Sequence, residues 1–442
     1  MPPSLHHLLG ALLAALLVAL ANGVQIQAAA SGDDAGRERA PVAKHVDLSE
    51  PLDPEEPAEV PAPTPAPAAL PLPESAPEVT PATEVPAEAR QPLILLGEQV
   101  APGTSVRLAW SPDQSFEGIA VPTAVLVVNG VREGPTLCLT AALHGDELNG
   151  IEIVRRVLYD LDAQKLSGTV VGVPIVNLHG FRRASRYLPD RRDLNRFFPG
   201  TEDGSSASRI AHSFFHQVIR SCDALVDIHT GSFQRTNLPQ LRADMKVPEV
   251  ADLTEGFGAT SVLHSPGEPG TLRRAAVEAG IPAVTLETGE PGRLQQKKIE
   301  HGTQGIETLL DHLGMYERVS VWHEPAPVYY ESTWVRADRG GLLFGEVSLG
   351  QRVREGELLG TVTDPISNLR SELRAPTGGR VLGMALNQVV MPGFAAFRIG
   401  IPTTESELSS PEAVAPADMA PPPDPEGPPP ENAPPRAEDE NS

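Results

Sequence analysis

The sequence predicts an α/β fold with a mixed, largely parallel sheet for residues 92–320 of the 442-residue chain. Short runs rich in Val, Leu and Ile alternate there with amphipathic stretches of helical period, which is typical of a parallel sheet covered by helices. Residues 325–402 carry shorter apolar runs and glycine-bearing turns, whereas residues 31–91 and 403–442 are rich in Pro, Ala and Glu. We therefore expect an α/β domain, a smaller β domain and two tails.

Residues 1–30 are expected to form a signal peptide region. The apolar run at residues 8–20 is too short to span a bilayer and leads into a small-residue Ala-Leu-Ala pattern ending at residue 21. His6 and His7 precede the run without any Lys or Arg, so an uncleaved membrane anchor is the alternative. We expect a secreted or periplasmic protein with no stable membrane span after signal cleavage.

The segments 31–91 and 403–442 have no periodic apolar face, so they cannot bury enough surface to offset the entropy of ordering. We expect both to be disordered. Each carries a net charge of −9, together 18 of the 23 net negative charges. The rest of the chain is only mildly acidic, and nothing in it indicates nucleic-acid binding.

Cys138 and Cys222 are the two cysteines of the chain, and each lies in or beside an expected strand. Two thiols do not make a disulfide scaffold, so we expect two small apolar fillers. A bridge between them stays open in an oxidising compartment.

The α/β part contains five expected strands and three expected helices. In parallel sheets, ligand sites form beyond the carboxyl ends of the strands, and the informative polar residues follow strands here. The expected strands cover residues 124–130, 136–143, 168–177, 224–231 and 283–289, and the expected helices cover 149–162, 207–222 and 271–280.

Three side chains at these strand ends have the character of metal ligands. His144 and Glu147 follow one strand across a turn into a helix, and His229 lies at the end of another. Two imidazoles and one carboxylate suit a tetrahedral zinc with a fourth position left for water. A lone HxxE more often caps a helix, but the second histidine and Glu287 favour a metal site. Glu287 ends an apolar strand, where an unpaired carboxylate is costly, and a general base would explain it.

The loop SRYLPDRRDLNRFFPG, residues 185–200, supplies further polar groups. Arg186, Asn195 and Arg196 offer donors suited to a carboxylate or an oxyanion. Asp193 could hold a ligand imidazole in the correct tautomer. The alternative for so many arginines is a solvated surface, but the apolar residues of the loop suggest that it folds inward.

Four motifs together, HGDE followed by NG, RDLNRFFPG, DIHTG and TLETG, resemble the succinylglutamate desuccinylase/aspartoacylase family in order and context. This family is the deacylase branch of the zinc carboxypeptidase-like hydrolases, and the resemblance covers about residues 94–400. It implies a sheet of the zinc carboxypeptidase type and one zinc ion per chain. The implied ligands are His144, Glu147 and His229, with Asp193 supporting His144 and Glu287 as the general base.

The resemblance also implies residues that bind the substrate. Asn195 and Arg196 would grip a substrate carboxylate, and Arg186 would polarise the scissile carbonyl. A further substrate arginine upstream of the general base would be Arg273 or Arg274, and the sequence does not choose between them.

The residues in and just after the turn from His144 to Glu147 also have expected roles. Gly145 and Gly150 would let the backbone turn sharply and approach other segments closely. Asn149 would cap the helix or donate from outside the ligand shell, and Asp146 would face solvent.

The β domain, residues 325–402, resembles the barrel-sandwich of biotinyl and lipoyl carrier domains through two half-repeats of short strands. Asn368 stands where a carrier would have its lysine, so a covalent carrier role is not expected. In related deacylases a similar domain borders the active-site mouth, which would limit access to small substrates.

We therefore expect a zinc-dependent amidohydrolase that deacylates a small carboxylate-bearing molecule such as an N-acyl amino acid. A zinc carboxypeptidase acting on short or cell-wall peptides is the first alternative, and a metal-free binding protein is the second. The acyl group, the amine and the oligomeric state are not predicted.

Overall fold

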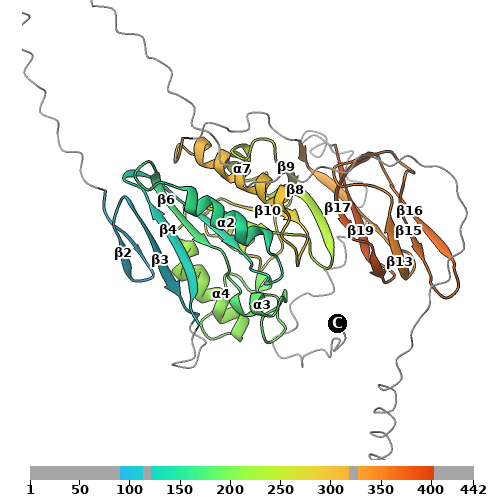
Figure 1. Ribbon diagram of the computed structural model, residues 1–442, viewed down its shortest axis with the longest axis horizontal. Coiled ribbons are helices and arrows are strands. Elements are labelled where there is room, and N and C mark those ends of the chain that lie inside the picture. Colours follow the sequence, from blue (N-terminus) through green and yellow to red (C-terminus); the bar gives the residue numbers. More distant parts are fainter. Residues whose placement is uncertain (1–89, 113–120, 318–326, 403–442) are drawn as a thin grey trace, which may run out of the picture. The chain divides into compact units, whose positions relative to one another are not determined.

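The computed structural model describes residues 90–112, 121–317 and 327–402 (Figure 1). The expected signal region, almost all of the expected linker and the acidic tail lie outside these residues. Within the described ranges, no helix is both long and apolar enough to cross a membrane.

Four parallel strands in the order β6-β5-β7-β10 form the centre of the main sheet. Every residue of β7 and β10 is buried, because helices cover both faces of this part of the sheet. This confirms the expected α/β fold with a large mixed sheet. The central strands are β5 (Arg132–Ala141), β6 (Ser167–Val173), β7 (Ala224–His229) and β10 (Ala283–Gly289).

Antiparallel strands extend the centre on both sides. β4 and then β3 continue it beyond β6, and β8 continues it beyond β10, with β9 parallel to β8. A separate two-stranded sheet of β1 and β2 precedes them. These strands are β1 (Leu93–Leu95), β2 (Glu98–Val100), β3 (Thr104–Trp110), β4 (Thr123–Asn129), β8 (Arg235–Ala243) and β9 (Ser261–His264).

Alternate side chains of β5 enter two different apolar cores. Leu137 and Leu139 belong to the core with the side chains of α2, α5 and α7, whereas Cys138 belongs to the core with those of α4 and α6. Figure 1 shows α2 and α7 on one face of the sheet and α4 on the other. The helices are α2 (Asn149–Asp160), α3 (Leu178–Arg182), α4 (Ser206–Gln217), α5 (Pro248–Glu255), α6 (Leu272–Glu278) and α7 (Gln296–His312), with 3-10 turns η1 (Leu194–Arg196) and η2 (Ile219–Ser221).

The helices α5 and α7 were not among the predicted ones. The sequence of α7 contains Gly302 and Gly305, and glycine disfavours a helix interior. In the structure these glycines allow close packing, because a Cβ atom at Gly302 would lie 2.5 Å from Cδ1 of Ile153 on α2. Tertiary packing thus outweighs the local propensity.

The first residue that the structure describes, Arg90, contacts the main sheet. The guanidinium of Arg90, which we assigned to the linker, donates hydrogen bonds to Oδ1 of Asn129 at 2.7 Å and to the carbonyl oxygen of Gly168 at 2.9 Å. These contacts attach Arg90 to the ends of β4 and β6.

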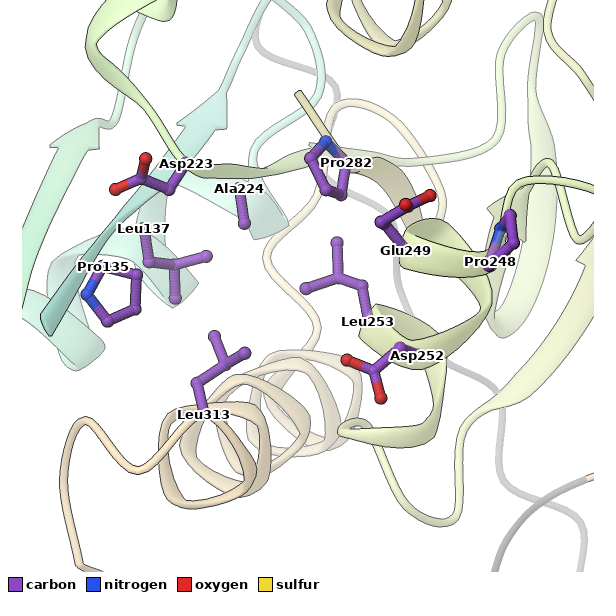
Figure 2. Close-up of a pocket in the computed structure, with 10 residues that line it drawn as sticks. All are labelled: Pro135, Leu137, Asp223, Ala224, Pro248, Glu249, Asp252, Leu253, Pro282 and Leu313. Atoms are coloured by element: carbon purple, nitrogen blue, oxygen red, sulfur yellow. The ribbon is translucent and has the colours of Figure 1, made fainter. Parts of the chain in front are cut away.

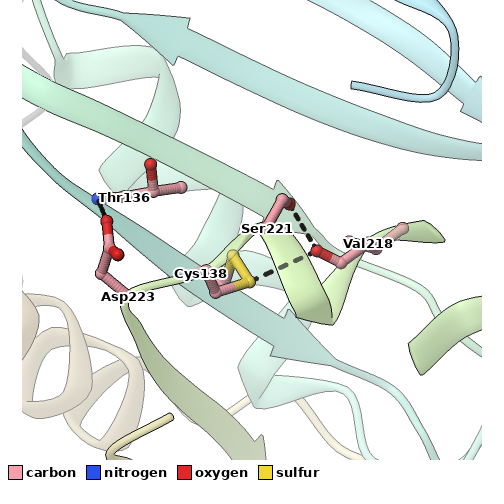
Figure 3. The surroundings of a disulfide bond; sticks show 6 residues. Thr136, Cys138, Val218, Ser221 and Asp223 are labelled. Carbon is pink, nitrogen blue, oxygen red and sulfur yellow. Dashed lines mark hydrogen bonds between the residues drawn. A yellow bond between two sulfur atoms is a disulfide. The ribbon is translucent and has the colours of Figure 1, made fainter. Parts of the chain in front are cut away.

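A disulfide joins Cys138 on β5 to Cys222, and the two Cα atoms are 5.7 Å apart (Figure 3). Our expectation of two separate apolar fillers was therefore wrong, although both residues are buried as expected. The pairing depends on the parallel register of β5 and β7, which places Leu137 opposite Ala224 and so brings Cys222 next to β5. Beside the bridge, the backbone nitrogen of Thr136 donates to Asp223 at 2.7 Å.

The expected β domain does not form a separate sheet system. Its strand β17 pairs antiparallel with β8, so the main sheet continues through β17 and β19 to β12. A second sheet, in the order β16-β15-β13-β18, shares an apolar core with it around Phe397. The barrel-sandwich assignment stays a prediction. These strands are β11 (Val328–Tyr329), β12 (Glu331–Arg336), β13 (Gly341–Gly345), β14 (Arg352–Val353), β15 (Leu358–Thr363), β16 (Arg370–Arg374), β17 (Gly379–Ala385), β18 (Gln388–Val390) and β19 (Ala395–Ile401).

Replacing both Cys138 and Cys222 by alanine should lower the free energy of unfolding. The bridge joins residues 84 positions apart, and restricting a loop of that length in the unfolded chain contributes about 4 kcal/mol. Denaturant unfolding of the oxidised wild type and the double variant measures the difference. Two free thiols in wild-type protein that was denatured without reductant would contradict the bridge.

Candidate active site

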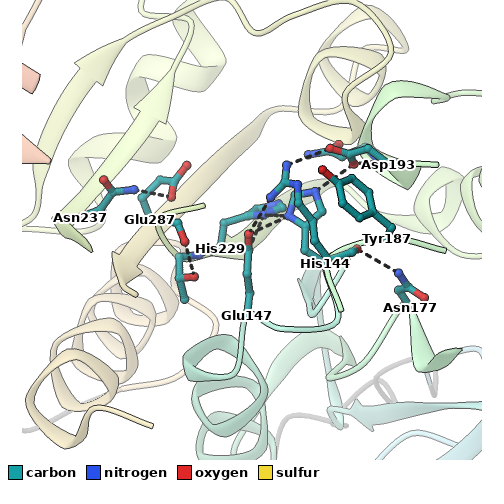
Figure 4. Close-up of polar contacts among 12 residues, drawn as sticks. His144, Glu147, Asn177, Tyr187, Asp193, His229, Asn237 and Glu287 are labelled. Carbon is teal, nitrogen blue, oxygen red and sulfur yellow. Dashed lines mark hydrogen bonds and ion pairs between the residues drawn. The ribbon is translucent and has the colours of Figure 1, made fainter. Parts of the chain in front are cut away.

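Four of the predicted site residues, His144, Glu147, His229 and Glu287, lie at the carboxyl ends of the central strands (Figure 4). His144 follows β5, His229 is the last residue of β7, and Glu287 lies near the end of β10. The parallel register of β7 and β10 places Glu287 directly beside His229. Residues that are far apart in the sequence therefore share one edge of the sheet.

His144, Glu147 and His229 form a buried cluster of candidate metal ligands whose ligand atoms all lie within 4.8 Å of one another. Nδ1 of His144 is 2.8 Å from Oε1 of Glu147, and Nδ1 of His229 is 2.9 Å from Oε2. The two Nδ1 atoms are only 3.2 Å apart. Two nitrogens and a carboxylate that converge in this way fit a divalent metal ion with an open coordination position.

An aspartate supports each of the two imidazoles on its other nitrogen. Nε2 of His144 is 3.0 Å from Oδ1 of Asp193, and Nε2 of His229 is 2.7 Å from Oδ2 of Asp227. An aspartate that accepts a hydrogen bond from Nε2–H favours the tautomer without a proton on Nδ1. The Nδ1 lone pair then faces the centre of the cluster, as a metal ligand requires. The hydroxyl of Thr140 donates to the other oxygen of Asp227 at 2.7 Å.

Sequence reasoning found Asp193 but missed Asp227. The signal was present in the DIH motif, because residues two apart on a strand project from the same face. An aspartate two positions before a ligand histidine on a strand is therefore a candidate support for that histidine.

The charges of the cluster reinforce one another. Burial lowers the pKa of His229, but Asp227 and Glu147 together raise that pKa well above its ordinary value. Burial raises the pKa of Glu147, but His144 and His229 hold it well below its usual range. Glu147 is therefore a carboxylate at any ordinary pH.

Arg186 lies against the ligand cluster. Its two terminal nitrogens contact Oε1 of Glu147 at 3.2 Å and Oδ2 of Asp193 at 2.9 Å. The ring of Phe233 lies 5.5 Å from its guanidinium carbon. Its Nε atom is buried and, within the described residues, has no hydrogen-bond partner.

Asn195 and Arg196 lie in the turn η1, whose first residue, Leu194, is fully buried. The loop therefore folds inward at this turn, whereas Pro189, Asp190 and Arg191 are exposed. Oδ1 of Asn195 accepts a hydrogen bond from the backbone nitrogen of Leu272 at 2.8 Å, so this side chain also attaches the loop to the start of α6. One terminal nitrogen of Arg196 donates to the carbonyl oxygen of Asn195 at 2.9 Å.

Glu287 is buried, with 6% of its surface exposed, but its carboxylate is not unpaired. Nδ2 of Asn237 donates to Oε2 at 2.9 Å (Figure 4), and a terminal nitrogen of Arg242 lies 3.2 Å from Oε1. Both partners come from β8. These contacts fix the direction of the carboxylate beside the ligand cluster.

The structure distinguishes the two candidate arginines upstream of Glu287. Arg273 is buried, with 5% of its surface exposed, and donates to the carbonyl oxygen of Ser265 at 2.7 Å. Arg274 instead pairs with Glu278 at 2.6 Å along the outside of α6. Arg273 is therefore the one that can reach a ligand inside the protein.

Both glycines of the ligand turn permit a close approach, as expected. A Cβ atom at Gly145 would lie 2.0 Å from the carbonyl carbon of Gly180, and one at Gly150 would lie 2.9 Å from Cβ of Ala141. Any larger residue at Gly145 would push α3 away from the ligand turn.

One of the two alternatives for Asn149, and the expectation for Asp146, were wrong. Asn149 does not cap α2. It is buried in the first turn of α2, where Nδ2 donates to the carbonyl oxygen of Thr288 at 3.0 Å and Oδ1 accepts from the backbone of Gln295 at 2.9 Å. Asp146 does not face solvent, because it is half-buried and its Oδ1 atom is buried without a partner among the described residues.

A cavity of about 420 Å³ lies at the opposite ends of the same strands (Figure 2). Its lining includes Pro135 in the first half of β5, Ala224 at the start of β7 and Pro282 just before β10. The ligand cluster follows the other ends of these strands. This cavity is therefore separate from the candidate active site.

Comparison with known proteins agrees with this geometry. Residues 133–313 match the Succinylglutamate desuccinylase/Aspartoacylase catalytic domain. N-alpha-acetyl-L-2,4-diaminobutyric acid deacetylase from Halomonas elongata is 29% identical over 272 residues, which cover 59% of this chain and 79% of that protein.

Two solved structures resemble the chain over about two thirds of its length. The ectoine utilization protein EutE (DoeB) from Ruegeria pomeroyi matches with a TM-score of 0.60 and 26% identity, covering 67% of this chain and 94% of its own. A succinylglutamate desuccinylase from Silicibacter sp. TM1040 matches with a TM-score of 0.59 and 26% identity, covering 67% and 93%. Over residues 133–313, the chain is therefore similar to the catalytic domain of the succinylglutamate desuccinylase/aspartoacylase family.

Proposed function

We propose that this protein is a zinc-dependent hydrolase that cleaves the linear amide of a small carboxylate-bearing molecule, such as an N-acyl amino acid. The carrying observation is the cluster of His144, Glu147 and His229, with Glu287 beside His229 in register. Ligands and a carboxylate base at one edge of a sheet are the parts that metal-assisted amide hydrolysis requires.

The donor set supports zinc as the metal. Two imidazoles and one carboxylate are a common catalytic zinc set, although such ligands also accept other divalent ions. When bound, zinc supplies a Lewis acid that polarises the amide carbonyl and activates a water molecule.

Glu287 would act as the general base. Its carboxylate takes a proton from the attacking water and returns it to the leaving nitrogen of the amide. The contacts from Asn237 and Arg242 hold both carboxylate oxygens, so the base needs little reorganisation. Arg186, which lies against Glu147, would polarise the scissile carbonyl from the side of the ligand cluster.

Asn195 and Arg196 would hold the substrate carboxylate. The η1 turn fixes them near Asp193, whose Oδ1 accepts a hydrogen bond from the backbone of Asn195 at 2.9 Å. The same aspartate supports His144, so the substrate grip and the ligand cluster are positioned by one side chain. The relatives carry deacetylase and desuccinylase names, and they do not favour the alternative of a carboxypeptidase.

We also infer that the protein works in an oxidising compartment outside the cytoplasm. The buried disulfide between Cys138 and Cys222 supports this inference, since such bridges persist where thiols are not kept reduced. The apolar run at residues 8–20 is the second support.

The purified, zinc-loaded protein should release free amine from N-acetyl and N-succinyl amino acids and should leave short unmodified peptides intact. Fluorogenic detection of primary amines across one panel of both classes measures this. Hydrolysis of the peptides alone would contradict the proposal and would favour the carboxypeptidase.

Glu287→Gln should lower kcat by about two to four orders of magnitude, because glutamine keeps the shape but cannot accept the proton. KM and metal content should change little, since Glu287 is not a ligand. Glu290→Gln is the matched control, because Glu290 is also buried but pairs with Arg293 instead. Near wild-type turnover in Glu287→Gln would show that Glu287 is a structural carboxylate.

Asp227→Asn should weaken zinc binding by about 10- to 100-fold, the usual effect of losing the support of a ligand histidine. Asparagine can donate an N–H to Nε2 of His229. That contact favours the tautomer with its proton on Nδ1, which cannot bind a metal through Nδ1. Competition with a chromogenic chelator measures the affinity. Asp223→Asn is the control, because Asp223 precedes the other end of β7, and equal affinities of the two variants would refute the role of Asp227.

A further inference from the structure

The loop between β7 and β8, residues 230–234, has a strained backbone. Phe233 and Gln234 have φ angles of 52° and 54°, in the left-handed region that disfavours every residue with a bulky side chain. Among the described residues, they are the one pair of neighbouring non-glycine residues in this region. Such strain persists only when the surrounding structure imposes it, and it is concentrated at functional sites. The loop directly follows His229, a candidate metal ligand.

Hydrogen bonds near both ends of the loop hold it in this conformation. The backbone nitrogen of Gly231 donates to the carbonyl oxygen of Gly289, the last residue of β10, at 2.9 Å. The carbonyl oxygen of Gln234 accepts from the backbone nitrogen of Leu386 and from Nε2 of Gln388, both at 2.9 Å. Leu386 directly follows β17, and Gln388 begins β18. The loop is therefore held between β10 on one side and the turn from β17 to β18 on the other.

This conformation places the ring of Phe233 beside Arg186. The ring centroid lies 5.5 Å from the guanidinium carbon, within the range of a cation–π contact. Phe233 is 39% exposed and belongs to none of the apolar core clusters of the described residues. The backbone of the loop, rather than packing in a core, therefore determines where the ring lies.

Arg235 also lies near this ring, but it has closer aromatic contacts. Its guanidinium carbon is 6.0 Å from the centroid of Phe233, compared with 4.6 Å for Phe394 and 5.4 Å for Trp334. Its Nε atom donates to the carbonyl oxygen of Ala395 at 2.8 Å. The position of Arg235 therefore does not depend on Phe233.

Arg186 has a donor that no described residue uses. Its two terminal nitrogens contact Glu147 and Asp193, whereas its Nε atom is buried with no partner among the described residues. A donor that is to stabilise charge on a substrate oxygen must be held in place before the reaction. Other contacts of the same side chain have to provide that restraint, and the Phe233 ring is one of them.

We propose that Phe233 is a positioning residue for Arg186, and that the strained loop at residues 230–234 holds its ring in place. This inference rests on the proposed amide hydrolysis, in which Arg186 polarises the scissile carbonyl. The ring acts through Arg186 and not on the substrate, so its removal affects kcat more than KM.

Phe233→Leu should lower kcat by about 2- to 30-fold with little change in KM, because leucine is apolar but has no π face. Phe233→Tyr keeps the π face and should retain most of the wild-type kcat. Phe344→Leu is the matched control, because Phe344 is also an exposed phenylalanine but lies on β13 in the second sheet. A wild-type kcat in Phe233→Leu, or an equal loss in Phe233→Tyr, would overturn the proposal.

A double-mutant cycle separates positioning from direct contact with the substrate. Arg186→Gln removes the cation, so adding Phe233→Leu to it should cause little further loss of kcat. An undiminished effect of Phe233→Leu in the Arg186→Gln background would mean that the ring does not act through Arg186.

Gln234→Gly tests the strain separately from the ring. Glycine adopts a positive φ without steric cost, so the midpoint of thermal unfolding should rise by about 1 to 4 °C while kcat stays unchanged. Ser232→Gly is the control, because Ser232 lies in the same loop but has no positive φ, and glycine there should lower the midpoint. A lower midpoint in Gln234→Gly would show that the loop is not strained.

The position of Arg186 can also be measured without turnover. Its buried Nε–H should give a nitrogen–proton NMR signal in the full-length, zinc-loaded protein, and Arg186→Gln identifies that signal by removing it. Phe233→Leu should shift the signal because the nearby ring is lost, and Phe344→Leu should not. A shift in Phe233→Leu together with no hydrolysis of any acyl amino acid would refute the proposed reaction alone. An unshifted signal in Phe233→Leu would refute the positioning role.

Discussion

Charge buried at the end of an apolar sheet has to be balanced, and the rest of this site depends on that constraint. Glu147, Asp193, Asp227 and Glu287 are all buried, and each contacts an arginine or a histidine. An unpaired buried charge would cost several kcal/mol, roughly the stability of a whole domain. The loops that carry the arginine and histidine partners of these carboxylates must therefore reach the carboxyl ends of β5, β7 and β10. They also explain why the segment around Arg186 and Asp193 folds inward despite its many charges.

The sequence predicted much of the fold and of the site, because both depend on local patterns. Apolar runs and helical periods predicted the α/β sheet, and polar residues just after those runs predicted the ligands at His144, Glu147 and His229. Asp193 was predicted from the polar loop at residues 185–200. Each of these residues is recognisable from its neighbours in the chain, and parallel strands then bring their carboxyl ends to one edge without further information.

The missed features depend on which strand lies beside which, and a single sequence does not contain that pairing. Arg242 can pair with Glu287 because β8 lies antiparallel beside β10. Cys138 and Cys222 can form a bridge because β7 lies parallel beside β5. Alternating apolar residues predicted strands in residues 325–402, but not that β17 would pair with β8. The glycines of α7 gave a misleading local signal, because their role is to let another helix come close.

The pairing of β17 with β8 has a mechanical consequence. A cover that is joined to a catalytic domain by a flexible linker can swing open as a rigid body, with a few hinge residues absorbing the motion. Here the backbone hydrogen bonds of β8 and β17 would have to break before the two parts could separate. While this pairing persists, these two parts of the chain therefore cannot move apart as separate rigid bodies.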